Sequence, residues 1–419
     1  MLSAEIIAIG SELLTPTKTD TNGLWLTARL NDIGIEVMLK TIVGDDEARL
    51  EETLRDAIRR SDIVITTGGL GPTEDDITRH CSAKALGRPL VYHDEIETAL
   101  RKRFNAWGRE MPEINKRQAY VIEGSAIIPN PNGSAVGMLA ETGTNLLIVL
   151  PGPPRENQPM FLENVLPRLR DMAGEIHVKR RLLRVSGLGE SAVDEIAAPI
   201  YTKYQNVQTS ILFNKSEVEI HVAATSGDPD EAQQIVDQLA DELSMALGRY
   251  VFSDKGESME EVVGRLLTEL NQTVSVAESC TGGLIGQRLT SVPGSSAYFL
   301  EGAVTYSNEA KKRTLSVPAD TLREYGAVSA ECAEAMAAGM RSYAGTDHAI
   351  SVTGIAGPGG GSDEKPVGTV FLGYSGSKGV FSRRIVLPGD RYLIRWRASQ
   401  AALDLLRRRL EKTDAGETH

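Results

Sequence analysis

The first 170 residues alternate between strand-like and helix-like segments, and this alternation restricts the fold more than any other feature of the chain. The strand-like runs are 5–9, 36–43 and 62–67, and the helix-like runs are 21–32, 47–60 and one that begins at residue 73. When strands and helices alternate in this way, successive strands lie parallel and the helices cover the faces of the sheet. We therefore predict a doubly wound parallel sheet for this part of the chain.

The segments that follow these strands carry the residues of a first candidate site. In doubly wound sheets, ligands bind beyond the carboxyl ends of the strands. The segments at those ends are G-S-E-L-L (10–14), V-G-D-D (43–46), T-G-G-L-G-P-T-E-D-D (67–76) and, after a further strand at 146–150, P-G-P-P (151–154). We expect these segments to converge on one site.

Glycines and acids in these segments suit the two parts of a metal-bound diphosphate. The glycines Gly68, Gly69 and Gly71 stand in a turn before a helix, where backbone N–H groups bind phosphate. The acids are Glu12, Asp45, Asp46, Asp75 and Asp76. Carboxylates are ligands for divalent cations, and Asp45 and Asp76 are the candidate metal ligands. The alternative is that the acids only cap the first turns of helices.

The chain is long enough for more than one core, and its pattern changes twice. A chain of 419 residues typically forms two or three domains. Residues 176–254 follow the order strand, helix, two strands, helix and short strand, which predicts a small α+β module. Its S-G-L-G-E-S segment (186–191) lacks the G-x-x-G loop with which KH domains hold nucleic acid. Strands and helices interleave again in a third unit, so the predicted domains are 1–172, 176–254 and 258–412.

The overall charge and the cysteines argue against several classes of protein. The formal net charge is -12, whereas nucleic-acid binding relies on clustered Lys and Arg, so nucleic acid is not an expected partner. The three cysteines are widely spaced and lack C-x-x-C, which indicates neither a disulfide framework nor a zinc site. The sequence has no run of 18 apolar residues and no signal-peptide pattern. We expect a cytoplasmic protein that does not span a membrane.

The third unit contains the heptapeptide A-E-S-C-T-G-G (277–283), directly after an apolar strand-like run. It places two potential nucleophiles, Ser279 and Cys280, at a strand-to-helix turn. The N–H groups of the first helical turn after Gly282 and Gly283 are expected to bind an anion or oxyanion. The alternatives are that Ser279 or Thr281 only caps the helix and that Cys280 is a small buried hydrophobe.

Histidine, the usual partner of a catalytic serine, is scarce in the third unit. Only His348 and His419 lie there, and His348 opens a strand rather than ending one. The strand after the heptapeptide runs to Tyr306, and the helix that follows has Lys311 near its start. A lysine acts as a base when burial or nearby cations lower its pKa, so Lys311 is the candidate base for Ser279. The alternative is a solvated lysine on the surface.

Two further segments of the third unit suit a phosphate. A glycine-rich loop at 354–368 follows the strand that ends at Thr353 and exposes backbone N–H groups, to which Lys365 adds charge. The loop lacks the G-K-[ST] ending of a P-loop, and a plain connecting loop is the alternative. Arg391 opens the final helix, where it is placed to bind a carboxylate or phosphate.

Taken together, the motifs resemble those of the CinA family of competence/damage-inducible proteins. The C-terminal domain of that family is recognised in A-E-S-C-T-G-G, T-Y-S-N-E-A-K, V-S-V-T-G-I-A-G-P-G-G-G and K-P-V-G-T-V. The first unit, through G-S-E-L-L, T-G-G-L-G-P-T-E-D-D and P-G-P-P, is similar to a molybdopterin-binding domain. The resemblance implies an α/β protein with an N-terminal doubly wound parallel sheet, a small α+β KH-like module and a C-terminal α/β amidohydrolase domain.

The resemblance also implies an activity for the third unit. Amidohydrolases of this family release ammonia from nicotinamide mononucleotide and leave nicotinate mononucleotide, using a serine and a lysine that correspond to Ser279 and Lys311, with Tyr306 beside them. The implied substrate-binding residues are Cys280, Thr281 and Gly282 at the oxyanion, Thr353, Gly354, Gly357 and Gly360 at the nucleotide, and Arg391 at its phosphate. No cofactor is expected for this reaction.

For the first unit, the resemblance implies a pyrophosphatase that cleaves ADP-ribose with a divalent metal ion. For the whole protein it implies a homodimer that acts in pyridine nucleotide recycling. The alternative is a protein that binds molybdopterin or a nucleotide without hydrolysing it. A role in DNA processing or as a scaffold rests only on the family's competence name, and the acidic charge disfavours it.

Overall fold

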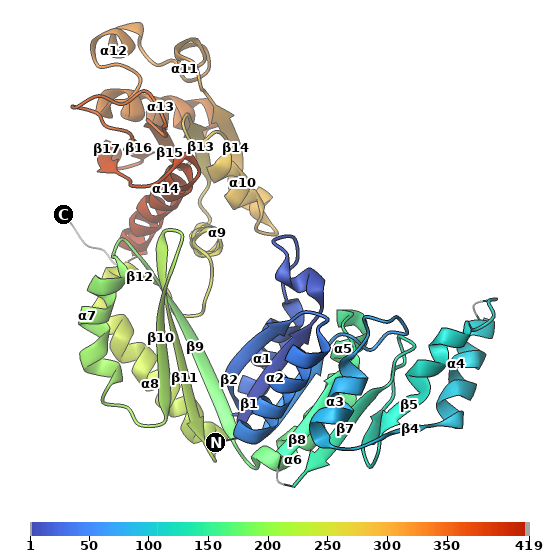
Figure 1. Cartoon of the computed structure of the whole chain (residues 1–419). Helices are drawn as coiled ribbons and strands as arrows, with labels where there is room; N and C mark the ends of the chain where they lie inside the picture. The colour runs from blue at the N-terminus through green and yellow to red at the C-terminus, as the bar shows by residue number, and fades with distance from the viewer. Residues whose placement is uncertain (1, 107, 144, 415–419) are drawn as a thin grey trace. The chain divides into compact units, whose positions relative to one another are not determined.

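The structure is a computed structural model that describes residues 2–106, 108–143 and 145–414. The chain forms two compact units (Figure 1). One unit holds the residues up to 179 together with 225–232, and the other holds 180–224 and the residues from 233 onward. Every helix in the described ranges is too short or too polar to cross a lipid bilayer.

A six-stranded sheet in the order β2-β1-β3-β8-β7-β6 forms the centre of the first unit. Its strands are β1 (Ser3–Ile9), β2 (Glu36–Val43), β3 (Ile63–Thr67), β6 (Ala126–Ile128), β7 (Gly137–Thr142) and β8 (Asn145–Leu150). The pairs β1–β2, β1–β3 and β3–β8 are parallel, whereas β7 and β6 add an antiparallel edge. A separate antiparallel pair joins β4 (Leu90–Tyr92) to β5 (Tyr120–Ile122). The predicted parallel sheet is confirmed.

Helices cover both faces of this sheet. They are α1 (Thr21–Asn31), α2 (Glu47–Arg60), α3 (Thr78–Leu86), α4 (Asp94–Ala106), α5 (Pro154–Met160) and α6 (Leu166–Ala173), with the short turns η1 (Ser11–Leu14), η2 (Glu113–Ala119) and η3 (Phe161–Val165). Adjacent residues of β3 enter different cores, Val64 on one face and Ile65 on the other. Because side chains alternate along a strand, a strand buried on both faces reads as a continuous apolar run.

The middle module is a four-stranded sheet in the order β10-β11-β9-β12, with two helices packed on one face. Its elements are β9 (His177–Ser186), α7 (Glu190–Tyr201), β10 (Val207–Asn214), β11 (Glu217–Ser226), α8 (Pro229–Leu247), η4 (Gly248–Tyr250) and β12 (Val251–Ser253). Val193 of α7 and Leu239 of α8 share one core with Val185 and Ile220 of the sheet. The predicted α+β module is confirmed.

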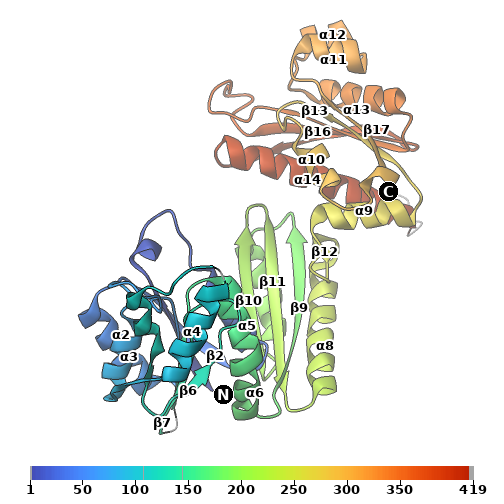
Figure 2. The ribbon, with the colours of Figure 1, turned by 90° about the vertical axis from the view of Figure 1, so that its right-hand side faces the viewer.

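The C-terminal part contains a five-stranded sheet in the order β14-β13-β15-β16-β17. Its strands are β13 (Val274–Glu278), β14 (Phe299–Val304), β15 (His348–Gly354), β16 (Thr369–Gly376) and β17 (Gly379–Val386). The helices are α9 (Met259–Glu269), α10 (Leu284–Thr290), α11 (Asn308–Leu315), α12 (Ala319–Glu324), α13 (Ala330–Ala344) and α14 (Arg391–Asp414), with the turn η5 (Ser295–Ala297). Helices α13 and α14 pack on opposite faces (Figure 2).

The three strands β13, β14 and β15 are parallel, and this places three loops at one edge of the sheet. The loops start at Ser279, Thr305 and Ile355. Carboxyl ends of parallel strands are the usual place for a site in such a sheet.

Candidate active site

Ser279 stands directly after β13, beside the carboxyl end of β15. Its backbone N–H donates to the carbonyl oxygen of Val352 at 2.9 Å and continues the pairing of the two strands. The chain then turns through Gly282 and Gly283, whose φ values of 62° and 95° favour glycine. Ser279 is 8% exposed, so its hydroxyl lies in a largely dry turn that a ligand can still reach.

The carboxylate of Glu278 holds this turn and binds the backbone N–H groups at the start of α10. Its carboxylate is buried and accepts three backbone N–H groups at 2.9, 3.2 and 2.9 Å, those of Gly283, Ile285 and Gly286. These are donors that a helix leaves free in its first turn. The interpretation of Ser279 or Thr281 as a helix cap is therefore wrong, and so is the expectation that the first turn of α10 binds an anion.

Lys311 is buried near the start of α11, a helix capped by the Ser307 hydroxyl, which accepts the N–H of Ala310. Lys311 is 1% exposed, and its Nζ lies 3.1 Å from Ser279 Oγ. The same nitrogen donates to the carbonyl oxygens of Thr305 at 2.8 Å and Tyr306 at 3.4 Å. The alternative of a solvated lysine is wrong for Lys311, and the predicted meeting of Ser279 and Lys311 is found.

Burial sets the protonation of this lysine. Desolvation lowers the pKa of Lys311 below its ordinary value of 10.5. Within the described residues, the amine contacts one hydroxyl and two carbonyls but no carboxylate that would hold its charge. Burial therefore shifts the balance towards the neutral amine, which is the form that accepts a proton.

The neighbouring thiol is the weaker nucleophile. Cys280 is 6% exposed, and burial raises the pKa of its thiol to about 12. Burial likewise raises the pKa of Cys332, which lies near Lys311 in the core below α11. Because the thiolate is the reactive form of cysteine, a thiol that stays protonated has little reactivity. Of the two, the serine is therefore the better candidate for the nucleophile.

Two backbone donors next to Ser279 are available for an oxyanion. Across the described ranges, the N–H of Thr281 has no backbone or side-chain acceptor and the N–H of Cys280 contacts only its own thiol, whereas the N–H of Gly282 donates to the Ser279 carbonyl at 3.1 Å. The side chain of Arg395 donates to the Thr281 carbonyl at 2.7 Å and fixes this peptide. Gly282 is therefore not an oxyanion donor, contrary to the expectation for it.

Arg391 ties two of the loops together at the rim of the site. Its guanidinium donates to the Gly357 carbonyl at 2.8 Å and to the phenol oxygen of Tyr306 at 3.0 Å. Arg391 and Tyr306 are both exposed, so a ligand can reach them. Thr353 is different, because its buried hydroxyl donates to the Ala327 carbonyl at 2.6 Å and supports the sheet edge.

Contacts with neighbouring segments of the protein hold the glycine-rich loop at 354–368 in place. Lys365 donates a hydrogen bond to the carbonyl of Val328 at 2.8 Å, so its ammonium group binds the protein itself rather than a phosphate. Gly354 packs tightly, since a Cβ there would lie 2.7 Å from the Thr369 carbonyl oxygen. Gly360 has a φ of 87° and permits the turn of the loop.

Sequence reasoning missed three residues that shape this site. Glu278 accepts hydrogen bonds from the backbone N–H groups at the start of α10. The carbonyl of Thr305 accepts a hydrogen bond from Lys311, and Arg395 holds the Thr281 peptide through its carbonyl. An acid directly before a strand-to-helix turn is a signal for the first of these. The other two act through backbone carbonyls, which leave no mark in a sequence.

A second cavity of about 510 Å³ lies at the strand ends of the N-terminal sheet. Glu12, Gly68, Gly69, Gly71 and Asp76 line it, together with the P-G-P-P segment. The lining residues that the sequence did not indicate include Asp20, Asn22, Gln118, Ser134 and Glu156. Three of the four predicted segments converge here, and the fourth, 43–46, forms hydrogen bonds with segment 10–14.

The acidic side chains predicted for the N-terminal site accept hydrogen bonds from the backbone of nearby loops. Asp76 accepts the N–H groups of Gly71 and Thr73 at 2.7 and 2.9 Å and the Thr73 hydroxyl at 2.6 Å. This stapled turn explains why α3 begins at Thr78 rather than at the predicted residue 73. Asp45 accepts the N–H of Ser11 at 2.9 Å, and Asp46 caps α2.

The predicted carboxylate cluster does not form. Asp45, Asp46 and Asp75 do not line the cavity. In the part of the chain described here, no three His, Cys, Asp or Glu side chains are grouped to hold a metal ion. The residues present therefore do not fit a resident metal with Asp45 and Asp76 as ligands.

Three family models match consecutive parts of the chain. Residues 5–171 match the probable molybdopterin binding domain, residues 180–253 the damage-inducible protein CinA KH domain, and residues 256–410 the CinA C-terminal domain. A CinA-like protein of Solibacter usitatus is 47% identical over 98% of this chain and 98% of its own length. The chain belongs to the CinA family.

A second CinA-like relative supports the same relation. A CinA-like protein of Koribacter versatilis is 48% identical over 97% of this chain and 99% of its own length. The solved structure of the competence/damage inducible protein CihA from Agrobacterium tumefaciens is 44% identical and covers 36% of this chain and 95% of its own, with a TM-score of 0.35. The expected CinA resemblance, with its molybdopterin-binding-like and KH-like parts, is confirmed.

Proposed function

We propose that the C-terminal domain hydrolyses the carboxamide of nicotinamide mononucleotide to nicotinate mononucleotide and ammonia. The observation that carries this proposal is the pair of Ser279 and Lys311, in which a buried amine of lowered pKa lies 3.1 Å from a hydroxyl. An amidase of this kind needs a nucleophile and a group that moves its proton. The choice of nicotinamide mononucleotide rests on the resemblance of the motifs to the CinA amidohydrolases.

In the first half of the proposed reaction, Ser279 Oγ attacks the carboxamide carbon while the neutral amine of Lys311 takes the hydroxyl proton. The tetrahedral intermediate collapses, the C–N bond breaks, and the Lys311 ammonium returns the proton to the departing ammonia. An ester between Ser279 and the nicotinate group remains. General acid–base transfer of this type contributes about 10²- to 10⁴-fold to a rate.

In the second half, a water molecule attacks the ester carbon and Lys311 takes its proton. The C–O bond to Ser279 breaks, and Lys311 gives the proton back to Ser279 Oγ. The carboxylic acid ionises, and both protein groups return to their starting state. One water is consumed and one ammonia is released, so the reaction needs no cofactor.

The N–H groups of Cys280 and Thr281 are the proposed oxyanion donors. They lie next to the nucleophile in sequence, and the contact of Arg395 with the Thr281 carbonyl keeps the peptide in place. Rigid donors of this type stabilise a tetrahedral oxyanion because they need no reorientation during the reaction. The guanidinium of Arg391 is the proposed contact for the 5'-phosphate at the rim of the site.

Ammonia release by the purified full-length chain tests the substrate assignment. We expect release from nicotinamide mononucleotide and much weaker release from nicotinamide riboside, which lacks the phosphate. Arg391→Gln should remove most of this preference by raising KM for the nucleotide about tenfold or more. No ammonia from either compound contradicts the proposal.

A second activity is favoured by the N-terminal cavity. Its glycine turn and its volume of about 510 Å³ suit a nucleoside diphosphate, so we propose ADP-ribose cleavage there. A divalent ion would arrive bound to the diphosphate, because Mg²⁺ is commonly held by one or two carboxylates together with substrate phosphates. Cleavage of ADP-ribose that depends on an added divalent cation supports this assignment, and no cleavage with any cation contradicts it.

The rival function is binding of molybdopterin or a nucleotide without hydrolysis. The molybdopterin-binding-like fold of the first unit is compatible with it. The ammonia assay separates the two, because a protein that only binds its ligand releases no product.

A further inference from the structure

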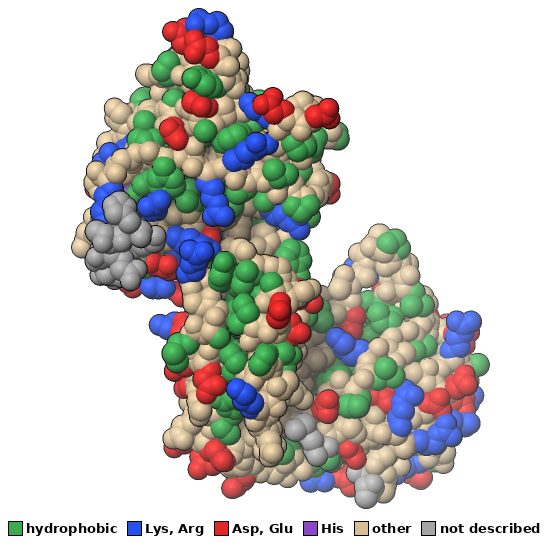
Figure 3. Space-filling view, turned by 90° about the vertical axis from the view of Figure 1, so that its left-hand side faces the viewer, with side chains coloured by type: hydrophobic (Ala, Val, Ile, Leu, Met, Phe, Trp, Pro, Cys, Tyr) green, Lys and Arg blue, Asp and Glu red, His purple; other side chains and the backbone are tan. Residues whose placement is uncertain are grey.

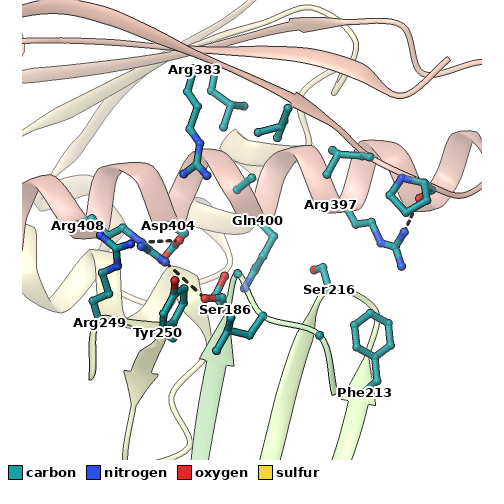
Figure 4. A pocket seen from close by; sticks show the side chains of 18 residues that line it. Ser186, Phe213, Ser216, Arg249, Tyr250, Arg383, Arg397, Gln400, Asp404 and Arg408 are labelled. Carbon is teal, nitrogen blue, oxygen red and sulfur yellow. Dashed lines mark hydrogen bonds and ion pairs between the residues drawn. The ribbon is translucent and has the colours of Figure 1, made fainter. Parts of the chain in front are cut away.

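A cavity of about 740 Å³ lies in the second unit, and none of its lining residues belongs to either proposed active site. Its walls come from the loop after β9, from η4, from β17 and from the outer side of α14 (Figure 4). Cavities of this size hold small organic ligands. Neither of the proposed activities uses it.

Positive charge is in excess around this cavity. Four arginines line it, Arg249, Arg383, Arg397 and Arg408, against one acid, Asp404. The negative charge of Asp404 is balanced by neighbouring arginines, because its carboxylate accepts hydrogen bonds from Arg407 at 2.7 Å and from Arg408 at 2.8 Å. Figure 3 shows Lys and Arg side chains gathered on one face of this unit. The chain as a whole is acidic, so this local excess is not a consequence of composition.

Among the described residues, Arg408 is the one of the four arginines that pairs with an acid, and the other three have no acidic partner. Of these three, Arg249 and Arg383 are exposed. Figure 4 shows Arg383 pointing from β17 into the cavity. Arg408 donates to the Ser186 carbonyl at 3.4 Å, and Arg397 donates to the Lys215 carbonyl at 3.3 Å. The walls are therefore held by two arginines while two others remain available.

The electrostatic field of the arginines is felt by a neighbouring phenol. The pKa of Tyr250 is lowered, first by a hydrogen bond from Arg249 and then by the charges of Arg249, Arg408 and Arg383. Because a positive field stabilises an anion, the same field stabilises the negative charge of a ligand. The buried hydroxyl of Ser216, which also lines the cavity, has no hydrogen-bond partner in the described part of the chain.

The loop after β9 adds backbone donors to the cavity wall. This loop is the S-G-L-G segment at 186–189, for which the sequence predicted no function. Gly187 has a φ of 91°, and Gly189 stands at the start of α7. No side chain caps α7 at this end. Glycines let a ligand approach the backbone closely, which suits an anion that already has arginine partners.

We propose that this cavity binds a phosphorylated small molecule of nucleotide size. Arg249 and Arg383 contact its phosphate groups, and the glycine loop and Ser216 supply neutral donors. The apolar lining from Leu188 and Leu387 contacts the rest of the ligand. A small molecule fits better than a nucleic acid, because the charge is confined to one cavity and the chain is otherwise acidic.

Calorimetric titration of the full-length chain with ADP and with inorganic pyrophosphate tests the proposal. Arg383→Gln should weaken ADP binding about tenfold or more, because a charge-assisted hydrogen bond is lost. Arg384→Gln is the matched control. Its side chain stands on the other face of β17, where it donates to the Glu364 carbonyl at 2.7 Å, and binding should change less than about twofold.

Hydrogen exchange assigns the binding to this cavity rather than to either proposed active site. ADP should slow the exchange of the backbone amides at 187–190, and Arg383→Gln should remove that protection. Three outcomes overturn the proposal. They are no saturable binding of either probe, equal binding by the two arginine variants, and protection of 187–190 by single-stranded RNA but not by ADP.

Discussion

Lys311 is held between two backbone carbonyls and the hydroxyl of Ser279, and burial removes water from its amine. A neutral amine has two protons for the carbonyls of Thr305 and Tyr306 and one lone pair for the serine proton. An ammonium would place its three protons on the same three oxygens, so the loss of solvation, and not the hydrogen-bond geometry, favours the deprotonated lysine. This is how a serine at the end of β13 can be activated without a histidine.

The pH dependence of ammonia release follows from this lysine. Its pKa is lowered from 10.5, and only the neutral amine accepts a proton. We expect kcat/KM to fall about tenfold per pH unit on the acid side of that lowered pKa. A pH–rate profile on nicotinamide mononucleotide measures this. The neighbouring Lys312, which pairs with Glu309, provides the control Lys312→Gln, which should leave the profile unchanged. A rate that falls with rising pH contradicts the assignment.

The same lysine should make stability depend on pH. The unfolded chain keeps the ordinary pKa, so between the two pKa values the unfolded state binds more protons and stability rises with pH. Lys311→Met removes this effect. We expect the Tm of the wild type to rise relative to that of Lys311→Met as the pH increases from the lowered pKa towards the ordinary value of 10.5. Thermal unfolding of both proteins across this range measures the difference, and a constant difference shows that the lysine pKa is not lowered.

At the scale of elements, the turn between β13 and α10 positions Ser279, the proposed nucleophile. Glu278 satisfies three N–H groups of that turn, and a buried charged acceptor of this kind is costly to alter. We expect Glu278→Gln to lower the free energy of unfolding by about 1–3 kcal/mol and to lower kcat as well. Urea unfolding and the ammonia assay measure both effects. Glu309→Gln, an exposed acid on α11, is the control and should change neither.

Regular elements were the most predictable part of this chain. The runs 36–43 and 47–60 coincide with β2 and α2, because their apolar periodicity and the cap at Asp46 are local signals. The helix expected from residue 73 starts five residues later, since Asp76 folds back on Gly71 and Thr73. A side chain that accepts hydrogen bonds from the backbone of a turn competes with helix formation there, and the spacing of apolar residues in the sequence does not reveal this competition.

The candidate sites were predictable to different degrees. The approach of Lys311 to Ser279 follows from topology, because both stand at carboxyl ends of neighbouring parallel strands. The supposed metal ligands failed, because Asp45 and Asp76 are committed to backbone N–H groups that a sequence does not show. The arginine-lined cavity was not foreseen either, since its walls come from segments near 187, 249, 383 and 408.

At the scale of the whole molecule, each proposed site is built from residues of one unit. Ser279, Lys311 and Arg391 belong to the second unit, whereas the cavity beside Asp76 belongs to the first. We expect Asp76→Ala to leave ammonia release within about twofold of the wild type, because sites in different units that share no residues act independently. The ammonia assay on Asp76→Ala measures this, and a large loss would show that the units are coupled.

The most direct test of the central claim compares two adjacent residues in the ammonia assay. Ser279→Ala should lower the rate at least about a thousandfold, because the nucleophile is removed. Cys280→Ala should keep most of the activity, because only the backbone of Cys280 takes part and its thiol stays protonated. Ammonia release by Ser279→Ala near the wild-type rate, together with an inactive Cys280→Ala, would contradict the account.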